Sequence, residues 1–127
     1  MKVLTLSLLT LLAFGYQGLV QAEVKLSGAA DIIGVWKVDA EAAKYDGEKK
    51  ALNVVWEFKE DGVLNTVSKD PRTSSFTVPL TYSVEDGMIR KQSVPGRQKF
   101  ESCTVLRKTP GSMDIKCTYL YFFLTKQ

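Results

Sequence analysis

The sequence of 127 residues predicts an all-β fold: a seven- to eight-stranded antiparallel up-and-down β-barrel with at most one short helix. Beyond residue 31, apolar side chains recur at every second position, which is the period of a strand rather than of a helix. Turn sequences such as Asp61-Gly62 and Asp86-Gly87 separate these runs and favour tight hairpins. No repeat, linker or low-complexity segment interrupts the pattern, so sequential hairpins in one domain are expected.

The strands follow from this alternation in chain order. The polar segment 39–50 is expected to be a long loop or a short helix, and the clearest alternation runs from Phe76 to Val84. Pro79 lies in the middle of that run and cannot donate a backbone hydrogen bond, which predicts an edge strand or a bulge there. The expected strands are 32–38, 52–60, 63–68, 76–84, 88–94, 99–108 and 113–125.

Connection lengths predict two different ends for the barrel. In a meander, successive connections alternate between the ends. The turns at 61–62, 86–87 and 110–111 are short and share one end, whereas 39–50, 69–75 and 95–98 are longer and share the other. This arrangement is typical of a cup-shaped binding barrel.

Residues 1–22 have the pattern of an export signal. Lys2 precedes an apolar run over 3–16, and Val20-Gln21-Ala22 supplies the small residues of a cleavage site before Glu23. The apolar run is shorter than the about 20 residues that a membrane span needs. We therefore expect cleavage, a barrel domain over 23–127 in the periplasm or outside the cell, and no membrane span after the signal is removed.

The two cysteines predict a disulfide. With a three-residue loop at 109–111, Cys103 lies opposite Cys117, and the same register pairs Val105 with Ile115 and Arg107 with Met113. In an exported chain such a pair is most simply a structural disulfide, which stabilises by about 2–4 kcal/mol.

Composition excludes several function classes. The absence of histidine removes histidine-based catalysis and metal ligation, and two cysteines are too few for a thiolate zinc site or an iron–sulfur cluster. Lys and Arg number 17 against 14 Asp and Glu, a net charge of +3, or +2 without Lys2, which does not predict nucleic-acid binding. The six basic residues between positions 90 and 108 are expected to point mostly into solvent. We predict no catalytic residues, metal or cofactor.

Binding of a small, mostly apolar ligand is the leading functional prediction. A barrel of this size either fills with its own side chains or holds one small ligand, and the sequence leaves both open. The side chains predicted to face inward and to contact a ligand are Trp56, Phe58, Phe76, Leu80, Tyr82 and Tyr119.

The C-terminal run is apolar on both of its faces. Alternation sends Tyr119, Tyr121 and Phe123 to one face and the three residues Leu120, Phe122 and Leu124 to the other. Something must cover the second face. Either the 39–50 segment packs there as a short helix, or Leu120, Phe122 and Leu124 are exposed and imply a protein partner or dimer.

Several short motifs resemble bacterial lipocalin-like, calycin-type domains. Gly34-Val35-Trp36 resembles the Gly-x-Trp signature of lipocalins, and the segments 58–64 and 82–87 resemble the strand–turn pattern of the bacterial domains. The resemblance implies that Trp36 is structural and packs across the closed end of the barrel. Lipocalins usually stack an Arg from the end of the last strand on this Trp, and this chain offers Lys126 instead.

The segment 24–36 also resembles the start of lipocalin-like inhibitors of bacterial metalloproteases. In those proteins a flexible N-terminal arm enters the protease cleft. The resemblance implies an alternative function, protease inhibition through residues 23–30. That arm is expected to contribute little to folding, because it carries mostly small residues.

Overall fold

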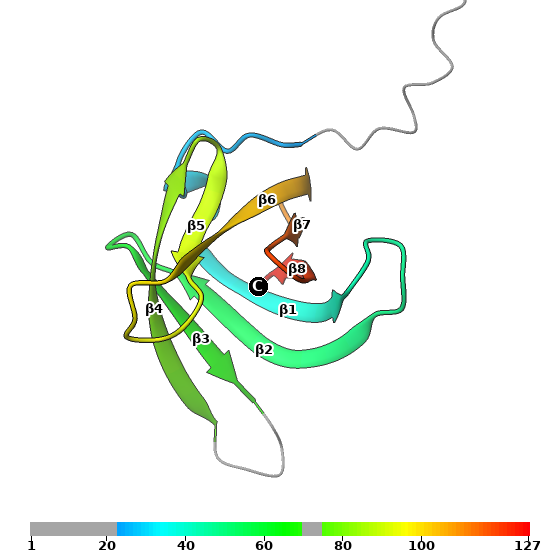
Figure 1. The fold of residues 1–127 in the computed structure, drawn as a ribbon, viewed down its shortest axis with the longest axis horizontal. Coiled ribbons are helices and arrows are strands. Elements are labelled where there is room, and N and C mark those ends of the chain that lie inside the picture. The colour runs from blue at the N-terminus through cyan, green and yellow to red at the C-terminus, as the bar shows by residue number, and fades with distance from the viewer. Residues whose placement is uncertain (1–22, 70–74) are drawn as a thin grey trace, which may run out of the picture.

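The computed structural model describes residues 23–69 and 75–127, and the predicted signal at 1–22 lies outside them. Eight antiparallel strands form a closed up-and-down barrel (Figure 1), which confirms the predicted fold class. The short 3-10 turn η2 (Ala29–Asp31) precedes the first strand. No described helix is long and apolar enough to cross a membrane. The strands are β1 (Gly34–Ala42), β2 (Lys50–Phe58), β3 (Val63–Ser68), β4 (Phe76–Glu85), β5 (Met88–Gln92), β6 (Phe100–Lys108), β7 (Ser112–Lys116) and β8 (Tyr121–Lys126).

Strand connections define two ends, which we call the floor and the mouth. The floor carries the short connections 59–62, 86–87 and 109–111, as predicted. The mouth carries 43–49, 69–75, 93–99 and a fourth connection, 117–120, that the alternation did not reveal. A hydrogen bond from the amide of Cys117 to the carbonyl of Leu120 closes this turn and divides the predicted strand 113–125 into β7 and β8.

Trp36 lies fully buried at the floor. Its indole N–H donates to the carbonyl of Ile32 at 2.9 Å, and the Lys126 ammonium lies 5.1 Å from the ring centroid. Lys126 therefore occupies the place where the lipocalin resemblance suggests an Arg. Gly34 makes room for it, because a Cβ at this glycine, whose φ is +130°, would lie 2.8 Å from Lys126 Cε.

The register of the last hairpins agrees only in part with the prediction. The disulfide Cys103–Cys117 is present, and Val105 pairs with Ile115. The predicted pair of Arg107 with Met113 is wrong: a bulge between Val105 and Arg107 shifts the register, so that Arg107 pairs with Asp114. A bulge adds one residue on one strand and increases the local twist.

Pro79 lies on a local edge, as predicted. Strand β4 pairs with β3 over its first half, Phe76 to Thr81, and with β5 only from Tyr82 onward. The Gln92 side chain takes the place of the missing partner, since its carbonyl oxygen accepts from the Thr81 amide at 2.7 Å. Its amide group donates to the carbonyl of Arg97 and so holds the 93–99 loop beside the gap.

The N-terminal arm, residues 23–28, is part of the barrel wall. Strand β5 is short, and the arm takes its place beside β6 (Figure 1): the amide of Val24 donates to the carbonyl of Val105 at 2.8 Å. The amide of Leu26 donates to Gly87, and the Leu26 side chain is buried in the core. The expectation that the arm contributes little to folding is therefore wrong, because that expectation did not consider burial of the Leu26 side chain. Protease inhibition through the arm stays a prediction.

The faces of the last strand are the reverse of those predicted, because the 117–120 turn resets the alternation. Leu124 is buried in the core and Phe122 packs against it from the inner face, so neither forms the predicted outer surface. Tyr121 and Phe123 face outward. The ring of Tyr45 covers them at centroid distances of 5.7 and 5.8 Å. The segment between β1 and β2 thus covers the outer face, which is one of the two alternatives considered above. It does so as a loop rather than a helix, and over Tyr121 and Phe123 instead of the predicted residues.

Candidate functional site

The middle of the barrel is packed with aromatic rings. Phe58 lies 5.0 Å from Tyr82 and 6.2 Å from Trp56 between ring centroids, and each of these three side chains is at most 7% exposed. The Tyr82 hydroxyl donates to the carbonyl of Lys59 at 2.6 Å. Burial raises the pKa of Tyr82, with smaller contributions from Asp61 and Glu60. These three predicted ligand contacts face inward, where they contact one another.

The other three predicted contacts lie elsewhere. Leu80 is buried and borders a hollow of about 560 Å³ beside Pro79 and Gln92. Phe76 and Tyr119 are 58% and 86% exposed, so the prediction that they face the interior is wrong. Phe76 lies on the part of β4 that has no β5 neighbour, and Tyr119 lies in the 117–120 turn.

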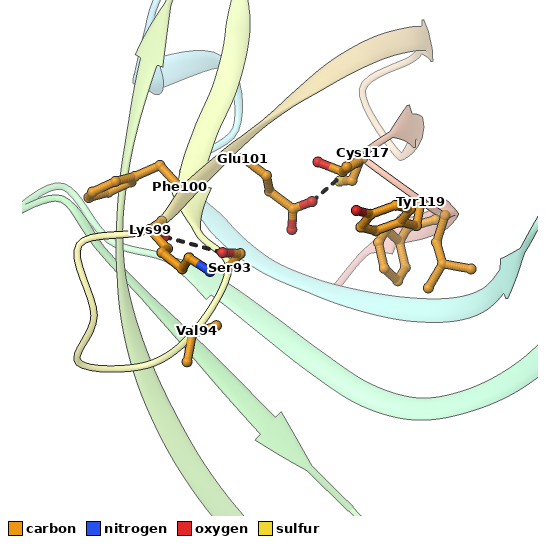
Figure 2. Close-up of a pocket in the computed structure, with 10 residues that line it drawn as sticks. Ser93, Val94, Lys99, Phe100, Glu101, Cys117 and Tyr119 are labelled. Atoms are coloured by element: carbon orange, nitrogen blue, oxygen red, sulfur yellow. Dashed lines mark hydrogen bonds between the residues drawn. The ribbon is translucent and has the colours of Figure 1, made fainter.

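A pocket of about 530 Å³ opens at the mouth between the 93–99 loop and the 117–120 turn. Figure 2 shows Glu101 in its centre, with Lys99 and Ser93 on one side and Cys117 and Tyr119 on the other. The apolar part of the wall comes from Val94, Tyr119, Leu120 and Phe122. This volume lies within the range of about 300–1,000 Å³ that is usual for sites of small ligands. We call it the mouth pocket.

An ion pair inside the barrel forms the polar part of this site. The ammonium of Lys91 lies 2.7 Å from one carboxylate oxygen of Glu101, with side-chain exposures of 8% and 17%. The other oxygen of Glu101 accepts from the amide of Thr118 at 3.1 Å, which ties the 117–120 turn to β6. The ammonium of Lys91 also lies 5.5 Å from the ring centroid of Trp56.

Sequence reasoning missed this pair, because Lys91 was grouped with the basic residues expected in solvent. The alternation did contain the signal. Lys91 stands two residues after buried Ile89, and Glu101 stands two residues before buried Cys103. In a strand such positions share a face. An ionic pair on the inner face of a small barrel is unusual enough to mark a site for scrutiny.

The Glu101 carboxylate is held in its ionised form. Burial alone raises the pKa of this group, but the hydrogen bond and charge of Lys91, followed by the hydrogen bond from Thr118, outweigh burial and bring its pKa below the usual value. Glu101 is therefore a fixed negative charge that already has a cationic partner. It can accept hydrogen bonds from a bound molecule, and it is a poor general acid near neutral pH.

Metal binding was not predicted, and the one described cluster with suitable atoms is already used. Oxygen and sulfur atoms of Glu101, Cys103 and Cys117 lie within 4.8 Å of one another. Both sulfurs belong to the disulfide, so neither is the thiolate that a soft metal needs. The carboxylate is paired with Lys91.

Fold and pocket together define a class of protein, a small antiparallel barrel with a closed floor and a hollow mouth. No protein-family model and no curated protein sequence matches the chain. Among solved structures it is similar to a lipocalin-like protein from Bacteroides uniformis ATCC 8492, with a TM-score of 0.63, 14% identity, and 76% of this chain and 99% of that chain covered. It is also similar to an uncharacterized protein from Bacteroides eggerthii DSM 20697, with a TM-score of 0.62, 12% identity, and coverage of 75% and 98%. The chain therefore has a lipocalin-like fold.

Proposed function

We propose that this protein is an exported, non-catalytic barrel that binds a small, mostly apolar ligand in the mouth pocket. The observation that carries the proposal is the pocket itself: about 530 Å³, with a largely apolar wall and two charged residues, Glu101 and Lys99, in its lining. Burial of apolar surface supplies most of the affinity in such a site, and a few polar groups orient the ligand.

The ion pair suggests what the ligand carries at its polar end. Each oxygen of Glu101 already accepts one hydrogen bond, from Lys91 or from Thr118, and a carboxylate oxygen can accept a second. A ligand with an apolar body and one hydroxyl or amide N–H fits this arrangement.

Fluorescence titration with N-phenyl-1-naphthylamine, a neutral apolar probe, tests the proposal. We expect saturable binding to the wild-type protein. Tyr119→Ala should weaken it about fivefold, because roughly 1 kcal/mol of contact with one aromatic wall is lost. Tyr119 is 86% exposed, so this change should leave stability nearly unchanged.

Phe76→Ala is the matched control. Phe76 is also an exposed aromatic residue at the mouth, but it does not line the mouth pocket. Its removal should leave the affinity for the probe unchanged. Absence of saturable binding, or equal weakening by both variants, would contradict a ligand site in the mouth pocket.

Export is tested separately by intact-mass analysis of the protein recovered outside the cytoplasm. The proposed form starts at Glu23 and has no alkylatable thiol before reduction, in keeping with the disulfide Cys103–Cys117. A retained segment 1–22, or two reactive thiols under native conditions, would contradict export with cleavage.

A further inference from the structure

The exposed apolar side chains of the barrel gather at one end. Three large apolar residues are exposed in the described ranges: Phe76 at 58%, Val94 at 38% and Tyr119 at 86%. Phe76 adjoins the 69–75 connection, and the other two lie in the 93–99 and 117–120 connections, so all three belong to the mouth. Apolar exposure confined to one end of a molecule marks an interaction surface.

Positive charge gathers at the same end. In the described parts of the mouth connections, five exposed basic residues stand against two acidic ones, Asp46 and Glu48. The floor connections carry Lys59 against Glu60, Asp61 and Asp86, and the basic residues Arg107, Lys108 and Lys126 at the adjoining strand ends offset these acidic charges. The five basic residues of the mouth are Lys44, Lys49, Lys69, Arg97 and Lys99.

We propose that the mouth docks on a lipid bilayer that carries anionic headgroups. Basic side chains attract such a surface, and neighbouring aromatic and aliphatic side chains enter the boundary between headgroups and acyl chains. The floor lacks both this excess of basic residues and the exposed large apolar side chains, so attraction at the mouth alone orients the barrel with its mouth toward the lipid. This docking does not depend on occupancy of the mouth pocket.

The spacing of the apolar residues favours lipid over an acidic protein. Val94 and Tyr119 line the mouth pocket from two different connections, and Phe76, at the start of β4, lies outside it, so the three do not form one cluster. A protein partner usually binds through a compact cluster of anchors in a well-packed centre. A lipid surface accepts scattered, shallow insertions, because it has no fixed shape to match.

Co-sedimentation with vesicles tests the proposal with the full exported protein. We expect binding to vesicles of equal parts phosphatidylglycerol and phosphatidylcholine, at least about tenfold weaker binding to phosphatidylcholine alone, and weakening by added sodium chloride. The double variant Lys69→Glu/Arg97→Glu should reduce binding to the anionic vesicles at least about tenfold. Phe76→Ser should reduce it by a smaller factor.

The control variant makes the same charge change at the other end. Lys59→Glu/Arg107→Glu reverses two exposed basic residues near the floor and should leave vesicle binding nearly unchanged. Neither Lys69 nor Arg97 lines the mouth pocket, so Lys69→Glu/Arg97→Glu should keep the wild-type affinity for N-phenyl-1-naphthylamine. Loss of vesicle binding without loss of probe binding therefore distinguishes membrane docking from ligand binding. Equal losses in both double variants, or no binding to anionic vesicles, would overturn the proposal. So would retention on polyglutamate without vesicle binding, which would indicate an acidic protein partner.

Discussion

Two lysines lie beside buried tryptophans that are cross-strand neighbours, Trp36 of β1 and Trp56 of β2, and the two lysine–tryptophan pairs are built differently. At the floor, the Lys126 ammonium lies 5.1 Å from the ring of Trp36 and donates to the backbone carbonyl of Ile33 at 3.1 Å. Toward the mouth, the Lys91 ammonium lies 5.5 Å from the ring of Trp56 and pairs with the Glu101 carboxylate.

The difference between these pairs shows how one barrel can be closed at one end and hollow at the other. At the floor, backbone carbonyls satisfy the indole and the ammonium, and the Leu26 side chain adds to the core, so the space is filled. Toward the mouth, a side-chain carboxylate satisfies the lysine and also ties the 117–120 turn to β6, and the pocket lies between this turn and the 93–99 loop. The floor is therefore filled by packed side chains, and the mouth keeps the open pocket in which we propose that a ligand binds.

Replacing the floor tryptophan is the most severe way to test this division. Trp36→Ala should lower the free energy of unfolding by about 3–5 kcal/mol, because it removes a fully buried indole and leaves a cavity. Urea denaturation measures this loss. Affinity for N-phenyl-1-naphthylamine in the folded fraction should change little. An unchanged denaturation midpoint would mean that Trp36 does not support the floor.

Removing the cation at the mouth should have a smaller effect. Lys91→Met leaves Glu101 without its partner and should lower the free energy of unfolding by about 2–3 kcal/mol. This loss is smaller than the loss for a fully buried pair, because Glu101 keeps some exposure to solvent. The double variant Lys91→Met/Glu101→Gln removes both charges and keeps an acceptor for Thr118, so it should be more stable than the single variant.

An exposed ion pair provides the control for this comparison. Lys37 and Asp39 lie 3.5 Å apart with exposures of 40% and 42%, and Lys37→Met should change stability by less than about 1 kcal/mol. If Lys91→Met is no more harmful than Lys37→Met, the Lys91–Glu101 pair does not hold the mouth together.

The effect of low pH on the free energy of unfolding should be the smallest of these effects. The pKa of Glu101 is lowered in the folded state by Lys91 and Thr118, so its ionised form stabilises the fold above the pKa of an unfolded-state glutamate, about 4.5. This contribution is lost as the pH falls through the lower folded-state pKa. Thermal denaturation of the wild type and Glu101→Gln across this range should show a stability difference that narrows with acid. A constant difference would mean that Glu101 does not titrate with the fold.

Local features of the sequence were enough to predict β1 to β6, the floor turns, an edge or bulge at Pro79 and the disulfide, but not the division of 113–125 into β7 and β8. Each depends on residues close in sequence or on one hairpin register. Alternation marks strands because successive side chains point to opposite faces, and Asp-Gly turns favour tight hairpins. The pairing of Val105 with Ile115 followed from the same hairpin that joins Cys103 to Cys117.

Only the tertiary structure decided which residues form the candidate site. Closure of the barrel determines where neighbouring strands end. It left Phe76 without a neighbour on β5, made room for the N-terminal arm beside β6, and brought Lys91 to Glu101. The four-residue turn at 117–120 reversed the faces of β8, because any break in a two-residue period can exchange inside for outside. The alternation of apolar and polar residues in the sequence indicates which residues share a face of one strand. The stagger of all eight strands, a property of the closed sheet, decides what each face meets.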